Sequence, residues 1–217
     1  MTKFQVIMLL GAIVLNANTP PDSCISKTWF PDGPVGTVVQ SGGKVYFCGS
    51  FEYVGPVSTS GEPHNNIAAL DAKTGAVTVW DPKANGIIRD LKVIGNSVYV
   101  IGDFDSIGGK PRNYLAAIDA TTGKATDWNP GLSEEGMPIY ALAFNGNTIY
   151  IGGDFLFEDQ VRTIMAFDAT NGKATDWSPD KNPDRFKNIT DDIPVDYIVF
   201  DIAISSDGKI IYASGSF

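Results

Sequence analysis

Histidine and cysteine are scarce in this sequence. The 217 residues include one histidine, His64, and two cysteines. A nucleophilic triad needs a base beside its serine or cysteine, and a histidine-rich metal site needs several histidines. His64 alone supplies neither, so we expect it to be a solvated loop residue. No catalytic residue and no cofactor site is predicted, and the chain is not expected to be an enzyme by itself.

Charge of either sign is also sparse, at 19% of residues, and the net charge is -9. An acidic surface repels phosphate backbones, which argues against nucleic-acid binding. No apolar run reaches the roughly 20 residues of a membrane-spanning helix. We therefore expect no membrane span.

The longest apolar run lies at the N-terminus, from Phe4 to Leu15, and is preceded by Lys3. A positive residue, a short apolar run and a small residue such as Ala17 are typical of a secretory signal peptide. We predict a signal peptide over residues 1–17, followed by an N-terminal segment over 18–34. The alternative is a buried N-terminal strand. Export predicts a secreted, extracellular or cell-surface protein, with the periplasm left open.

Both cysteines, Cys24 and Cys48, follow the predicted signal peptide. In an oxidising compartment they could form a disulfide that ties the N-terminal segment to the first repeat. The alternative is two unpaired, small apolar side chains.

Glycine is abundant, with 23 residues, and much of the chain is a repeat. An aromatic segment recurs as VYFCGSF, VYVIGDF, IYIGGDF and IYASGSF, and the Asp-x-x-Thr/Asn-Gly and Trp-x-Pro segments recur with it. Spacings between successive tryptophans are 51, 48 and 49 residues. A period of about 50 residues with short strands inside it is typical of propeller blades.

The central repeat alternates apolar and polar residues, as half-buried strands do. We predict strands over 87–93, 97–104, 114–119 and 124–128, with Gly95-Asn96 and Thr121-Thr122-Gly123 as turns. Such a sheet has two apolar faces and needs neighbours stacked on both. The predicted fold is an all-β propeller of four-stranded antiparallel blades. Its repeats span 35–82, 83–130, 131–179 and 180–217.

The fourth repeat lacks its Asp-x-x-Thr-Gly turn and its tryptophan. We therefore expect a fragment of a longer chain, in which three complete blades and a truncated fourth need further blades or a second chain to close the ring.

The recurring residues are predicted to be structural. Aspartates open the hairpins, glycines take positive φ there, and tryptophans pack between blades. Asp103 and Asp154 alternate with Ser50 and Ser216 at one position, which indicates a hydrogen bond to turn amides. The structural set is Phe51, Phe104, Phe155, Asp71, Asp119, Asp168, Gly75, Gly123, Gly172, Trp80, Trp128 and Trp177.

An insertion before the fourth repeat offers the one metal-like spacing. It partly fits a calcium-loop template, although position 6 of the template is Arg185 instead of glycine. An ordinary acidic loop is the alternative. The candidate ligands are Asp180, Asn182, Asp184, Asn188 and Asp191.

The combination of VYVIGDF, IGG, RN, LAAIDATTG and WNP in the central repeat resembles the delta-60-type repeat of secreted bacterial β-propeller proteins. This resemblance implies a propeller in an exported protein and brings no catalytic residue with it. The segments from the hairpin aspartate to the tryptophan (71–80, 119–128 and 168–177) also resemble, more weakly, those of quinoprotein dehydrogenase propellers.

We expect a binding or structural module whose partner is a protein or a glycan. The variable loops at 51–65, 105–112 and 157–162, together with the insertion, would hold this partner. The alternative function is part of a propeller hydrolase, lyase or quinoprotein-like dehydrogenase whose active site lies in other blades.

Overall fold

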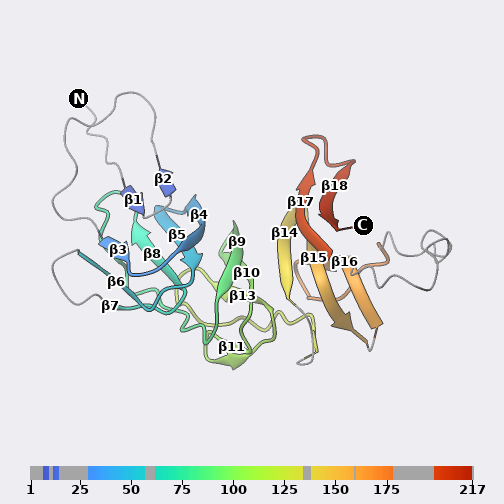
Figure 1. Cartoon of the computed structure of the whole chain (residues 1–217), viewed down its shortest axis with the longest axis horizontal. Helices are drawn as coiled ribbons and strands as arrows, with labels where there is room; N and C mark the ends of the chain where they lie inside the picture. The colour runs from blue at the N-terminus through green and yellow to red at the C-terminus, as the bar shows by residue number, and fades with distance from the viewer. Residues whose placement is uncertain are drawn as a thin grey trace.

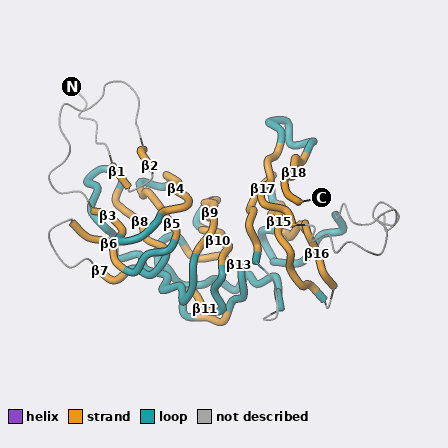
Figure 2. Tube along the Cα trace, in the orientation of Figure 1, coloured by secondary structure: helices purple, strands orange, loops and turns teal. Residues whose placement is uncertain are grey.

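The computed structural model describes residues 7–9, 12–14, 29–56, 62–133, 138–158, 160–177 and 198–216, and every regular element in them is a strand (Figures 1 and 2). The described residues thus confirm the all-β class. They contain no helix of the length and apolarity that crossing a bilayer would need.

Four antiparallel sheets follow one another along the chain, and we name them in that order. The first sheet contains β4 (Val35–Ser41), β5 (Lys44–Gly49) and β8 (Ile67–Asp71). The second contains β9 (Ile88–Ile94), β10 (Ser97–Gly102) and β13 (Leu115–Asp119). The third contains β14 (Ile139–Asn145), β15 (Thr148–Phe157) and β16 (Gln160–Asp168), and the fourth pairs β17 (Ile198–Ile204) with β18 (Ile211–Ser216).

Smaller pairings accompany these sheets. At the N-terminus β1 (Ile7–Leu9) pairs with β2 (Ala12–Val14). The strands β3 (Trp29–Pro31), β6 (Tyr53–Pro56) and β7 (Glu62–Pro63) form one small sheet. In the second repeat, β11 (Ser106–Ile107) and β12 (Lys110–Pro111) form a hairpin where only a loop was predicted. Gly108 and Gly109 make its turn, both at positive φ.

The sheets stack face to face, as their two apolar faces require. In β10, Val98 and Val100 pack toward the first sheet, whereas Tyr99 and Ile101 pack toward the third. A further core cluster joins the third sheet to the fourth. Alternation along each strand therefore places one apolar row in each of two neighbouring interfaces. The described sheets form an open series and no closed ring, so the propeller and its blade number remain predictions.

The prediction of a fourth strand in each of the first three repeats is wrong. Ala125 makes one isolated bridge to Ile118, and the ladder then ends at Thr126. The Thr126 hydroxyl donates to the Ala117 carbonyl at 3.1 Å and accepts from the Trp128 amide at 3.3 Å. Because a threonine side chain can replace ladder hydrogen bonds in this way, the chain leaves the sheet and carries Trp128 inward. Equivalent bridges link Leu70 to Val77 and Phe167 to Ala174.

One irregularity recurs in all four sheets. Where the first strand pairs with the second, the register skips one residue of the first strand, and a glycine of the second strand pairs with the residue just before it. At Gly102 a Cβ atom would lie 2.1 Å from the Ile87 carbonyl oxygen, which explains the glycine. The skipped residues are Gly36, Arg89, Tyr140 and Phe200.

Candidate functional site

The hairpin aspartates bind the amides of their own turns, as predicted. Asp119 Oδ1 accepts from the amides of Thr121 at 3.0 Å and Thr122 at 2.6 Å. The Thr122 amide is the main cause that lowers the pKa of Asp119, as the Thr74 amide does for Asp71. Asp168 binds its turn in the same way. These carboxylates therefore hold hairpins together and are not arranged as an acid–base pair.

The recurring tryptophans join one sheet to the next. Trp80 Nε1 donates to the Asp119 carbonyl at 3.0 Å, and Trp128 Nε1 donates to the Asp168 carbonyl at 2.9 Å. Each indole also meets the tyrosine of its own sheet edge to face, with centroids 5.1 Å apart for Tyr46 and Trp80. The predicted interblade packing role is thus seen as a contact between sheets.

The glycines of these turns have positive φ, as predicted: 71° at Gly75, 73° at Gly123 and 76° at Gly172. Two of them also touch the preceding repeat. A Cβ at Gly172 would lie 3.0 Å from the Asn129 backbone, and one at Gly123 would lie 3.4 Å from Asp81. Nothing lies within 4 Å of the corresponding point at Gly75.

The aromatic residues that close the second-strand motif, Phe51, Phe104 and Phe155, are all buried, as expected of structural positions. The carbonyl of Phe51 accepts from the Asn66 amide, and that of Phe104 accepts from the Tyr114 amide. The two phenylalanines therefore fix the entry to the third strand of their sheets.

Asp103 does not bind turn amides, which corrects the prediction for this position. Its carboxylate accepts two hydrogen bonds from Arg89, at 3.0 Å from Nε and 2.6 Å from Nη2. The prediction missed this pair because Arg89 occupies the skipped position of β9, and the register shift is not visible in the sequence pattern.

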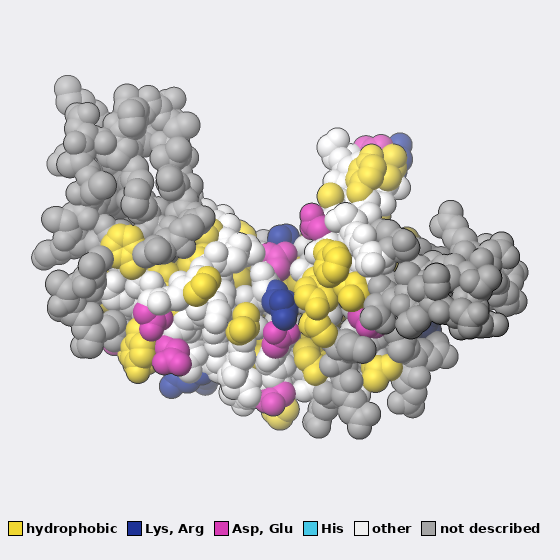
Figure 3. Space-filling view, in the orientation of Figure 1, with side chains coloured by type: hydrophobic (Ala, Val, Ile, Leu, Met, Phe, Trp, Pro, Cys, Tyr) yellow, Lys and Arg dark blue, Asp and Glu magenta, His cyan; other side chains and the backbone are white. Residues whose placement is uncertain are grey.

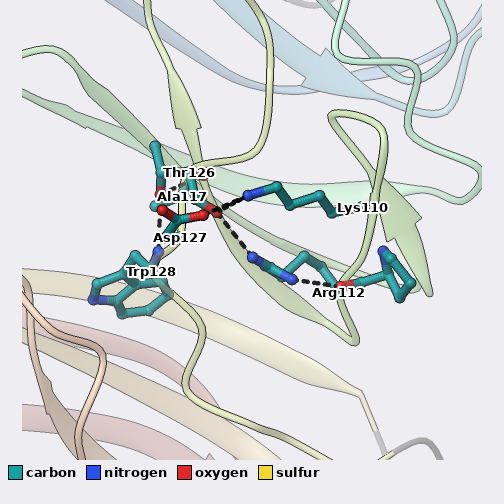
Figure 4. A network of polar contacts seen from close by, with 7 residues as sticks. Lys110, Arg112, Ala117, Thr126, Asp127 and Trp128 are labelled. Atoms are coloured by element: carbon teal, nitrogen blue, oxygen red, sulfur yellow. Dashed lines mark hydrogen bonds and ion pairs between the residues drawn. The ribbon is translucent and has the colours of Figure 1, made fainter.

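His64 is buried, with 6% of its surface exposed, and is not the solvated residue that we expected. Its Nε2 lies 3.2 Å from the Thr78 carbonyl oxygen. Arg112 fills the same place in the second repeat, where Nη2 donates to the Thr126 carbonyl at 2.8 Å and Nη1 to the Pro111 carbonyl at 2.7 Å (Figure 4). Beside it, Lys110 Nζ donates to exposed Asp127 at 2.6 Å, which lowers the pKa of that carboxyl.

Cys48 is a free thiol, so the disulfide with Cys24, one of the two alternatives, is not formed. Its side chain is fully buried between the first and second sheets. Burial is the largest cause that raises its pKa, followed by the charge of Asp90. Cys24 lies outside the described residues, as do the candidate calcium ligands Asp180 to Asp191.

The described residues contain no group of three or more histidine, cysteine, aspartate or glutamate side chains able to hold a metal ion. An open groove of about 770 Å³ runs between the first and second repeats. Its polar lining includes Asp81, Lys83, Lys110 and Lys124.

Three skipped residues gather into one surface feature, which we name the bulge cluster: Arg89, Tyr140, Phe200 and the Arg89 partner Asp103. The Arg89 guanidinium carbon lies 5.0 Å from the centroid of the Tyr140 ring. The Tyr140 and Phe200 rings meet at 68° with centroids 5.5 Å apart. In the space-filling view, basic, acidic and hydrophobic side chains lie side by side over β9 and β14 (Figure 3).

No family model matches the chain, and the comparison with curated proteins gave no match. Solved structures that match include two computationally designed proteins. Ika4 is 15% identical, with 86% of this chain and 93% of that chain covered and a TM-score of 0.45. Ika8 is 16% identical, with 83% and 55% covered and a TM-score of 0.43. At these TM-scores neither match bears on function.

Proposed function

We propose that this chain is a β-propeller repeat module, secreted or held at the cell surface, that binds a protein or glycan ligand without transforming it. The observation that supports this most is the use made of the repeated polar groups. The aspartates of the hairpins bind their own turns, and the tryptophans Trp80 and Trp128 bind the next turn. The repeated aspartates therefore hold the turns, and the repeated tryptophans hold neighbouring sheets together. The loops between these residues are free to vary in sequence.

The delta-60-type resemblance and the predicted signal peptide support the same proposal. The repeated contact between sheets is one that further sheets can extend, as a propeller requires. Propeller enzymes with an active site in other blades remain the alternative, but no described residue favours them.

The test is to apply the purified protein to arrays of immobilised glycans and extracellular proteins, and to incubate it with the same glycans in solution. The proposal predicts saturable binding to at least one arrayed molecule and unchanged glycans after incubation. Binding to nothing on either array, or conversion of a bound glycan, would contradict it.

A further inference from the structure

The bulge cluster brings together residues from three successive sheets. A bulge leaves one residue outside the hydrogen-bonded ladder and redirects its side chain, and bulges are frequent beside functional sites. Arg89, Tyr140 and Phe200 occupy this position in the second, third and fourth sheets. Because the sheets stack in the same register, their bulge residues meet.

We propose that the bulge cluster binds a neutral carbohydrate, with a pyranose ring stacked on Phe200 and its hydroxyl groups bonded to Arg89, Asp103 and Tyr140. This inference rests on the proposed function and names the ligand class and the site within it.

The apolar part of the site is Phe200, which is 51% exposed although it lies in a strand. Tyr140 holds the Phe200 ring from one side through the edge-to-face contact, and Arg89 in turn packs on Tyr140. A pyranose has one face made largely of C–H groups, and such a face packs on an aromatic ring. Aromatic side chains beside a few fixed polar groups are typical of ligand sites.

The polar part supplies donors and acceptors together. Asp103 occupies Nε and Nη2 of Arg89, whereas Arg89 Nη1 and the Tyr140 hydroxyl have no hydrogen-bond partner among the described residues. About a third of each side chain of the Arg89–Asp103 pair is exposed, at 34% and 35%. The carboxylate can accept further bonds. Neighbouring sugar hydroxyls donate and accept at once, so they match this pair.

Charge and size favour a neutral sugar over other ligands. Asp103 neutralises Arg89, so these four side chains add no net charge, and the chain as a whole has a net charge of -9. An acidic glycan would be repelled. A stable protein partner generally covers about 800 Å² of each surface, which is far more than four side chains offer.

The test uses calorimetric titration of the purified protein with cellohexaose, maltohexaose, chitohexaose and, as an anionic comparison, an oligogalacturonate. Phe200→Ala removes the stacking ring, and Arg89→Gly copies Gly36, which is the skipped residue of the first sheet. Tyr212→Ala is the matched control, because Tyr212 is an exposed aromatic residue of the fourth sheet that lies outside the cluster and outside the variable loops. Unfolding curves of all variants check that the fold is kept.

We expect at least one neutral oligosaccharide to bind, with about tenfold weaker binding in Phe200→Ala and in Arg89→Gly. Tyr212→Ala should bind like the unchanged protein. The proposal would be overturned if neither Phe200→Ala nor Arg89→Gly weakened binding, or if only the anionic sugar bound. If an arrayed protein or glycan binds but none depends on the cluster, the proposed function stands and this inference fails. If nothing binds in either experiment, the proposed function itself fails.

Discussion

His64 and Arg112 are different residues with the same task in successive repeats. Each is buried, and each lies beside the carbonyl of the threonine that ends its sheet, Thr78 or Thr126. That carbonyl would lose its partner if the side chain were removed, and a buried unpaired polar group is costly. The position therefore requires a side chain that can donate a hydrogen bond to the threonine carbonyl, and the acid–base chemistry of histidine plays no part there.

We predict that His64→Arg changes the free energy of unfolding by less than about 1 kcal/mol, whereas His64→Ala lowers it by about 1–3 kcal/mol. Urea unfolding of the two variants measures both values. Equal losses would mean that the carbonyl bond at this site contributes nothing.

The hairpin aspartates make stability depend on pH. Turn amides hold the pKa values of Asp71 and Asp119 below the ordinary 3.8. Their contribution is therefore complete above pH 3.8 and is lost as the pH falls through the lowered pKa values. Asparagine can accept the same amide bonds but does not titrate.

We predict that the double variant Asp71→Asn, Asp119→Asn loses less stability than the unchanged protein between pH about 4 and 2. Near neutral pH it should be slightly less stable, because charge-assisted hydrogen bonds are the stronger ones. Urea midpoints across this range test both statements. Parallel curves for the two proteins would show that these carboxylates do not govern acid stability.

At the scale of the element, the hairpin turn does two things. It reverses the chain between the third strand and the outer segment, and it offers its backbone to the preceding repeat. Gly123 and Gly172 lie against Asp81 and Asn129, whereas Gly75 has open space. The same residue type with the same φ therefore meets two different environments.

We predict that Gly75→Ala costs about 1 kcal/mol, the cost of a left-handed conformation. Gly172→Ala should cost about 2 kcal/mol or more, because its Cβ also presses on the Asn129 backbone. The free energies of unfolding of the two variants give the difference directly. If Gly75→Ala cost as much as Gly172→Ala, the contact between repeats would not be significant.

A strand could be predicted from the sequence wherever its alternation of apolar and polar residues ended at a residue that is typical of turns, such as glycine. The Gly95-Asn96 turn and the strands beside it agree with the prediction, since Ile94 pairs with Ser97 and Gly95 has a φ of 57°. The fourth strand was predicted wrongly because alternation continues to the tryptophan. The Thr126 hydroxyl, which ends the ladder, does not alter that pattern.

At the scale of the whole molecule, the candidate site could not be predicted. The bulge cluster depends on a register shift inside each sheet and on stacking between sheets, and neither can be read from one repeat. A signal was nevertheless present, because the second strand carries a glycine at the same place in every repeat: Gly49, Gly102, Gly153 and Gly215. Such a glycine marks a close approach of backbones and hence a bulge.

The tryptophan of one repeat docks on the turn of the next. Trp80 and Trp128 make this bond, whereas the Trp177 indole nitrogen has no such bond among the described residues. The Trp177 ring meets Tyr150 edge to face, with centroids 4.9 Å apart. Trp177 is half-buried, whereas Trp80 and Trp128 are buried. The three indoles therefore provide an internal comparison.

The most direct measurement is hydrogen exchange of the indole Nε1–H groups by NMR, with each signal assigned by a Trp→Phe variant. We predict slow exchange for Trp80 and Trp128, at rates that follow global unfolding, and fast exchange for Trp177. Fast exchange at all three indoles would contradict the docking of each repeat on the next, and with it the stacked arrangement that brings the bulge cluster together.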